Sequence, residues 1–277
     1  MIRLITDSSC LYTPKETEEM GFVVNPLSVT INNKQYVEFV DITAREFVDI
    51  INQGHIPTSS QPSVGLLIET FKKYPNDDLI VLTIADGLSG TYDSALIAKN
   101  SIENNENIHV INTKTLCGPH KYLVEETLKL IKEGKSLDEI LNYINNKIET
   151  VISFLLPKDF GYLKRGGRLT PLAATLAGVL KLQPVVTQTK DGKRLDKFVI
   201  GRNFREAIKK VLNFYKDKLS DNHRIYISHG FNLKDAKYVE SVFRKEFPNS
   251  YIEVLELSCA FITQGGPLCV AIQTIEA

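Results

Sequence analysis

The sequence predicts an α/β fold, because short apolar runs rich in β-branched residues alternate along the chain with helical patterns. The clearest strand is residues 79–84, a run whose apolar character is typical of a strand buried within a sheet. The clearest helix starts are Thr13, Thr43 and Ser136, each followed three residues later by Glu, which is the spacing of a capping box. Strands joined by capped helices are the pattern of an α/β protein.

The first half of the chain carries the most regular alternation. Asn32 and Asn33 separate expected strands at residues 28–31 and 35–37, and this pair favours a tight hairpin turn. The remaining elements expected here are strands at residues 2–5, 22–27, 110–111 and 151–156, and helices that begin near residues 13, 43, 62, 91 and 136.

The second half alternates less regularly. Residues 172–182 form an expected helix of small residues that is apolar nearly all round and is therefore buried. Such a helix belongs either to the core or to the lining of a tunnel for an alkyl chain. The other expected elements are strands at residues 185–189, 225–228, 252–257 and 269–272, a turn at 191–192 and a helix at 204–215.

A domain boundary is expected near residue 157. Pro157 follows the strand at 151–156, and a Gly-rich basic loop over residues 161–168 comes next. A length of 277 residues suits one large domain or two of ordinary size. We therefore expect an N-terminal α/β domain over residues 1–157 and a C-terminal α/β domain over residues 158–277.

Composition limits the classes of partner. The 33 basic residues balance 33 acidic ones, so no overall field attracts nucleic acid or an anionic membrane. No apolar stretch approaches the roughly 20 residues that span a bilayer, and the first strand begins too early for a signal peptide. The four cysteines show no CxxC spacing, which favours free thiols in the cytoplasm and gives no indication of zinc or another metal.

Two loops place hydroxyl groups at expected helix starts. Thr58, Ser59 and Ser60 precede Pro62, which favours an early helical position and makes Ser60 the expected N-cap. Ser89 and Gly90 follow the buried strand at 79–84, at the carboxyl edge of the sheet where α/β proteins bind ligands. Helix N-termini favour anions. Ordinary helix capping explains the same hydroxyls equally well.

The anion that suits these loops is a carboxylate. A phosphate site normally brings a Lys or Arg, but neither loop contains one, Asp86 lies close to the second, and GxxxxGK and GxGxxG motifs are absent from the sequence. Hydroxyls and backbone amides without a countercharge match a carboxylate better than a di- or triphosphate. A buried head group of this kind must still be hydrogen-bonded.

Three further groups are weaker candidates. His229 ends an expected strand, although a lone His is more often structural and no Ser–His–Asp order supports catalysis. Asp7 also ends a strand and could cap a helix or orient the hydroxyls. The basic residues over 164–168 lie either on a solvated loop or at a docking site for an acidic partner or phosphate.

The chain resembles the DegV family of bacterial fatty-acid-binding proteins, also called FakB-type. The resemblance runs through residues 6–8, 57–63, 88–95 and 162–168, in order over most of the chain. It implies a Rossmann-like parallel sheet in the N-terminal domain and a mixed sheet in the C-terminal domain, with a lipid tunnel between them. It also implies no catalytic residue and no cofactor.

The resemblance further implies a long-chain fatty acid as ligand and a fatty acid kinase as partner, which would phosphorylate the presented carboxyl group. The carboxylate would lie on Ser59 or Ser60 and on Ser89, and Arg168, with Arg202 second, would meet the kinase. Gln264 stands where the family tends to have a His. A Gln can donate a hydrogen bond but carries no charge.

Three hypotheses follow from the sequence. The first is a fatty acid carrier with the carboxylate on Thr58, Ser59, Ser60, Ser89, Gly90 and Gln264. The second is an enzyme or phospho-carrier of the dihydroxyacetone-kinase type that uses His229 as nucleophile. The third is an interaction protein whose basic loop, with Arg168, binds an acidic partner without lipid.

Overall fold

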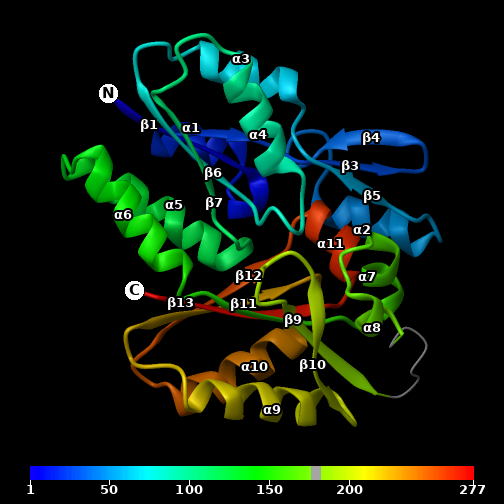
Figure 1. Ribbon diagram of the computed structural model, residues 1–277. Coiled ribbons are helices and arrows are strands. Elements are labelled where there is room, and N and C mark those ends of the chain that lie inside the picture. The colour runs from blue at the N-terminus through cyan, green and yellow to red at the C-terminus, as the bar shows by residue number, and fades with distance from the viewer. Residues whose placement is uncertain (176–181) are drawn as a thin grey trace. The chain divides into compact units, whose positions relative to one another are not determined.

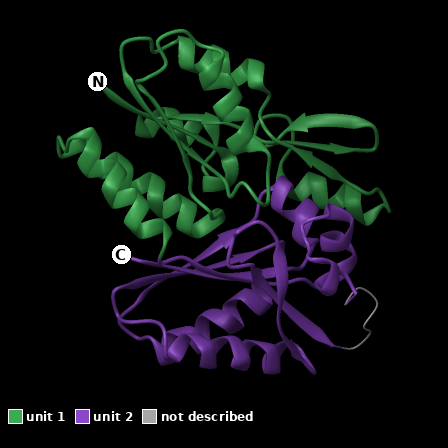
Figure 2. Cartoon of the chain, viewed as in Figure 1, with its two compact units in different colours: residues 1–149 green, residues 150–277 purple. Residues whose placement is uncertain are grey.

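The computed structural model describes residues 1–175 and 182–277 (Figure 1). The chain divides into two compact units, residues 1–149 and 150–277 (Figure 2). A boundary near residue 157 would assign the strand β8 (Ile152–Leu156) to the first unit. β8 instead pairs with β13 (Val270–Glu276) and β9 (Gln183–Gln188), so its hydrogen bonds belong to the second unit.

The first unit is built on a parallel sheet with the strand order β2-β1-β6-β7. This confirms the expected parallel sheet. Its strands are β1 (Ile2–Asp7), β2 (Val23–Asn25), β6 (Asp78–Thr83) and β7 (Ile108–Asn112). One face packs through Ile5, Leu79 and Val81 against helix residues that include Leu67 and Phe71, all of them buried.

Six α-helices accompany this sheet. They are α1 (Pro14–Met20), α2 (Ala44–Asn52), α3 (Val64–Lys72), α4 (Thr91–Asn100), α5 (Cys117–Lys132) and α6 (Leu137–Ile148), and a short 3-10 helix η1 (Ser8–Cys10) follows β1. All three expected capping boxes form, because Thr13, Thr43 and Ser136 each accept a hydrogen bond from the backbone N–H of the Glu three residues later. These local signals alone determine where the three helices begin.

A separate three-stranded antiparallel sheet, β4-β3-β5, follows from the expected hairpin. β3 (Ser28–Ile31) and β4 (Lys34–Val37) are joined by Asn32 and Asn33 at φ values of 51° and 58°, as a tight turn requires. β5 (Thr58–Ser60) pairs with β3.

The expected N-cap at Ser60 is wrong. Ser60 lies in β5, and the N-cap of α3 is Ser63, whose Oγ accepts from the backbone N–H of Leu66 at 3.2 Å. Pairing with β3 extends the backbone through residue 60, so Pro62 precedes the helix instead of starting it.

The second unit is built on a mixed sheet with the order β10-β9-β8-β13-β11-β12, as expected. The strands not yet described are β10 (Leu195–Gly201), β11 (His223–His229) and β12 (Tyr251–Glu256). α9 (Phe204–Lys216) and α10 (Leu233–Glu246) pack on one face around a core that includes Phe154, Tyr215 and Phe243. The sequence did not predict β10 or α10.

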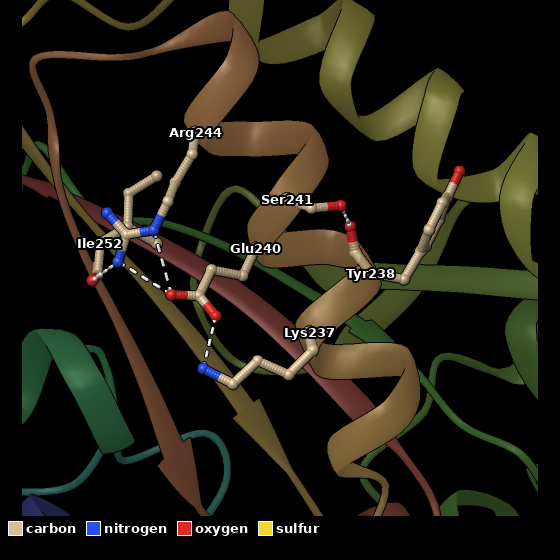
Figure 3. Close-up of polar contacts among 6 residues, drawn as sticks. All are labelled: Lys237, Tyr238, Glu240, Ser241, Arg244 and Ile252. Carbon is tan, nitrogen blue, oxygen red and sulfur yellow. Dashed lines mark hydrogen bonds and ion pairs between the residues drawn. The ribbon is translucent and has the colours of Figure 1, made fainter.

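A group of charged side chains on α10 connects this helix to the edge strand β12 (Figure 3). Glu240 accepts hydrogen bonds from Lys237 at 2.7 Å and from Arg244 at 2.8 Å. Arg244 also donates to the carbonyl oxygen of Ile252 in β12 at 3.0 Å. These bonds, led by the one from Lys237, hold the pKa of Glu240 below its ordinary value.

The basic segment at residues 161–168 is mostly helical, so the expected loop is wrong. α7 (Phe160–Gly166) is capped at its start by Asp159, which accepts from the N–H of Gly161, and ends at Gly167 with a φ of 72°. Two further helices are α8 (Pro171–Ala174) and α11 (Cys259–Gly265). The helix expected at 172–182 falls largely on residues 176–181, which lie outside the described residues.

Candidate functional site

The two hydroxyl loops of the first unit lie against each other. A Cβ atom on Gly90 would lie 2.9 Å from Nε2 of Gln61, so the segment after β5 contacts the start of α4. The loops do not share one sheet edge as expected, because β5 belongs to the three-stranded sheet whereas the second loop follows β6 of the parallel sheet. Tertiary packing brings them together.

The start of α4 has hydroxyl groups and no side-chain cap. Its N-cap is Gly90, which offers no side chain to the first turn of the helix. Ser89 Oγ and Thr91 Oγ1 lie 2.9 Å apart, and the backbone N–H of Thr91 points to Ser89 Oγ at 3.4 Å. A helix N-terminus with hydroxyls favours a bound anion, and Asp93 in the first turn of α4 opposes this effect.

The hydroxyls of β5 face two ways. Side chains alternate along a strand, so Thr58 and Ser60 lie on one face and Ser59 on the other. Thr58 and Ser60 are exposed, whereas Ser59 is half-buried opposite Val29 of β3. The structure therefore does not direct all three of these hydroxyls to a single point.

Asp7 links the ends of β1 and β6 beneath this site. It is 2% exposed, and its Oδ2 accepts from the backbone N–H of Ile84 at 2.8 Å. Its Oδ1 accepts from the N–H of Ser9 at 2.9 Å. Asp7 therefore caps η1, which is one of the two roles expected for it. It also fixes the start of the loop that carries Ser89.

A buried histidine continues this polar network. His120 of α5 lies 2.9 Å from Thr6 through Nε2 and 2.5 Å from Ser9 through Nδ1. The hydroxyl of Thr6 donates to the carbonyl oxygen of Leu82, so it accepts from Nε2–H, and Nδ1 then accepts from Ser9. Burial lowers the pKa of His120, against an opposing effect of Asp7, and the ring is neutral.

A buried carboxyl group joins the same strand end to the segment after β4. Ser8 donates a hydrogen bond to Glu38 Oε1 and accepts one from the N–H of Leu27 at 2.9 Å. Glu38 has no exposed surface. Neither Glu38 nor His120 was predicted from the sequence, because their partners lie far away along the chain and the only local signal is the run of polar residues that ends β1.

Two expected residues of the second unit lie close together. Gln264 of α11 packs on α7, since a Cβ on Gly166 would collide with the Oε1 of Gln264. Arg168 Nη1 donates to the carbonyl oxygen of Gly166. Arg202 is exposed at the end of β10, where its backbone N–H donates to Glu206 at 3.2 Å.

His229 lies at the carboxyl end of β11 and is 5% exposed. Its Nδ1 makes no hydrogen bond within the described residues. Burial lowers its pKa, and Glu256 of β12 opposes this effect.

Residues 1–175 and 182–277 contain no group of three or more His, Cys, Asp or Glu residues arranged to hold a metal ion. None of the helices in this part of the chain combines the length and the apolar character needed to cross a bilayer. Its four cysteines are buried free thiols, as expected: Cys10, Cys117, Cys259 and Cys269.

Comparison with known proteins covers the whole chain. A family model described as an uncharacterised protein of the DegV family matches residues 1–277. A DegV domain-containing protein of Halalkalibacterium halodurans is 28% identical over 259 residues, which cover 91% of this chain and 90% of that protein. One from Clostridium perfringens is 24% identical over 254 residues, covering 88% and 87%.

Solved structures share the fold. The crystal structure of a fatty acid binding DegV family protein from Streptococcus agalactiae is 25% identical, with a TM-score of 0.90 over 100% of this chain and 99% of that one. A DegV family protein from Thermus thermophilus, described by its fatty acid binding, is 23% identical with a TM-score of 0.89 over 100% and 99%. A stearic acid-binding protein from Eubacterium ventriosum is 20% identical with a TM-score of 0.87 over 100% and 98%.

Proposed function

The chain belongs to the DegV family, and from this premise we propose that it binds a long-chain fatty acid with the carboxylate at the start of α4. The observation that carries the proposal is the contact between Gly90 and Gln61, which brings the two hydroxyl loops together at an N-terminus without a side-chain cap. The carboxylate would be held by Ser89 and Gly90 with hydroxyls from one face of β5, either Ser59 or the pair Thr58 and Ser60, and with Gln264 as a further donor.

The acyl chain would supply most of the affinity. Burial of an alkyl chain contributes about 0.8 kcal/mol per methylene, so about 16 carbons contribute on the order of 10 kcal/mol before ordering costs. The protein would act as a carrier with no catalytic residue or cofactor, working in the cytoplasm, where buried thiols such as Cys10 stay reduced.

Ligand identification tests carriage directly. Protein expressed in bacteria is extracted with organic solvent and the extract is analysed by mass spectrometry, with the expectation of a long-chain fatty acid near one equivalent. The delipidated protein is then offered the free acid and its methyl ester. Failure both to retain and to take up the acid would overturn the proposal.

Presentation to a fatty acid kinase is the second part of the proposal. Arg168 and Arg202 would contact the kinase, since a guanidinium group suits an acidic surface. Arg168→Glu is expected to abolish kinase-dependent acyl phosphate formation while the bound lipid is retained, measured by ADP release and by mass spectrometry of the lipid. Loss of lipid in Arg168→Glu would instead assign Arg168 to the fold of α7, where it already bonds to Gly166.

The alternative enzyme or phospho-carrier uses His229. The Nδ1 of His229 makes no hydrogen bond within the described residues, which favours a role as nucleophile. The His229 side chain is only 5% exposed, however, which disfavours its attack on a phosphate group. Incubation with radiolabelled phosphoenolpyruvate and ATP, compared between wild type and His229→Ala, separates the two. Label that is lost in His229→Ala would support the enzyme.

A further inference from the structure

A cleft of about 410 Å³ lies at the edge of the parallel sheet in the first unit. Among the strands of residues 1–175 and 182–277, β7 pairs only with β6, so it is the edge strand on this side. The consecutive residues His109–Asn112 of β7 line the cleft. The walls come from α4, through Tyr92 and Lys99, and from α6, through Leu141 and Asn145.

The cleft encloses the strand edge and not one face of the sheet. Ile108 and Val110 pack into the core beneath α3 and α4, so strand alternation turns His109 and Ile111 to the opposite face. Residues from both faces nevertheless line the same cleft. The backbone edge of β7 therefore lies along its floor.

The backbone groups at this edge point into the cleft. The N–H of Thr113 donates to the carbonyl oxygen of Thr83, and the carbonyl oxygen of Asn107 accepts from the N–H of Leu79. Residues 107 and 113 therefore direct these backbone groups toward β6. Backbone groups alternate in direction along a strand, so Val110 and Asn112 direct their N–H and C=O groups away from β6. Within the described residues, these groups have no other strand to pair with.

Lys99 gives the cleft a positive charge, because no acidic residue is among those lining it. The side chains of Lys99 and His109 make no hydrogen bond or ion pair in the described part of the chain. A second copy of this chain, paired edge to edge, would bring Lys99 against its own counterpart. An acidic partner is favoured instead.

We propose that the edge of β7 binds an extended acidic peptide segment of a partner protein, which adds a strand to the parallel sheet. Main-chain hydrogen bonds to Val110 and Asn112 supply the affinity, and carboxylates beside Lys99 and His109 supply the specificity. Because β7 has five residues, it can pair with an extended segment of about four to five residues. This inference is independent of the fatty acid proposal.

The test uses the full chain and the capped peptide acetyl-Glu-Val-Glu-Val-Glu-amide, labelled for fluorescence anisotropy. The wild-type protein is expected to bind it, and a peptide with every amide N-methylated is expected not to bind, because it keeps the charges but donates no hydrogen bond. Hydrogen exchange is expected to slow at Val110 and Asn112 in the complex. No binding at millimolar peptide overturns the proposal.

Charge variants complete the test. Lys99→Glu is expected to weaken binding about tenfold. Lys72→Glu is the matched control, because Lys72 occupies the last turn of the adjacent α3 and is outside the cleft, and it is expected to leave affinity unchanged. Equal losses in both variants, or displacement of the peptide by inorganic phosphate, would show a diffuse charge effect or a small-anion site and would overturn strand addition.

Discussion

Ser89 is the single side chain on which the proposed carboxylate site depends most. Its hydroxyl lies beside that of Thr91 at the uncapped start of α4, so it can accept from that neighbour while donating to a ligand. The site would thus hold an anion with neutral donors and a helix terminus, without a cation in either loop.

Ser89→Ala is expected to weaken fatty acid binding by roughly 1.5–3 kcal/mol, the range for a hydrogen bond to a charged group. Ser136→Ala is the matched control, since it removes a hydroxyl that caps α6 and should lower stability by about 1 kcal/mol. Fatty acid titration of both delipidated variants measures the effect. Unchanged affinity in Ser89→Ala removes this residue from the site.

His120 is the buried ionisable residue whose effect on stability is easiest to measure. Burial lowers its pKa, so in the folded chain it remains neutral at pH values where the unfolded chain, with an ordinary pKa of about 6.5, is already protonated. The unfolded state then binds more protons. The free energy of unfolding must therefore fall as the pH drops below about 6.5.

His120→Gln is expected to lower stability at pH 8 by about 1–3 kcal/mol, because Ser9 and Thr6 lose a well-placed partner. The same variant is expected to lose less stability than wild type between pH 7 and pH 5, because the titrating group is gone. Urea unfolding across this pH range measures both effects. His55→Gln, at a histidine outside the network, should follow the wild-type profile; a steep acid slope retained in His120→Gln would contradict this explanation.

At the scale of elements, close backbone packing fixes the turn from β10 into α9. A Cβ on Gly201 would lie 2.6 Å from the backbone N of Ala207 and 2.8 Å from the carbonyl oxygen of Asn203. Neither atom belongs to a flexible side chain, so the helix start would have to move. Gly201 therefore permits the tight passage from strand to helix.

Gly201→Ala is expected to destabilise the protein by about 1–3 kcal/mol, the usual cost of overpacking. Gly65→Ala offers the opposite case, because Gly65 lies within α3 and its added Cβ meets nothing within 4 Å. That variant is expected to gain roughly 0.5–1 kcal/mol from helix propensity. Thermal unfolding of the pair gives the comparison, and a Gly201→Ala variant as stable as wild type would be inconsistent with the contact.

At the scale of the whole molecule, two units with different sheets form one chain that matches a single family from end to end. The first unit holds the hydroxyl loops, and the second holds Gln264 and Arg168. Under the proposed function, a bound fatty acid would stabilise the folded chain, and this effect can be measured without knowledge of the acyl chain length.

Removal of the bound lipid is expected to lower the melting temperature. Saturation at about one hundred times Kd adds about 2.7 kcal/mol of stability, which corresponds to several degrees for a protein of this size. Calorimetry of delipidated protein, before and after addition of palmitic acid, measures the shift, with methyl palmitate as the control that lacks the carboxylate. Equal melting curves in all three samples would count against carriage.

The sequence alone determined the α/β class, the three capping boxes and the hairpin at Asn32 and Asn33. These features depend on side chains and backbone groups only a few residues apart, so their physics is visible in the sequence. The positions of Ser89 and Gly90 at a helix start were visible for the same reason, since they directly follow a strongly apolar strand.

Only the tertiary structure decided the rest. The sequence could not show that β5 is a strand, because its pairing partner β3 lies about thirty residues earlier, nor that residues 161–166 form most of a helix that packs against Gln264. The hydrogen bond between His120 and Ser9, which are 111 residues apart, likewise could not be predicted without the folded chain. Pairing and burial act between residues that are distant in sequence, and no local pattern encodes which of them will meet.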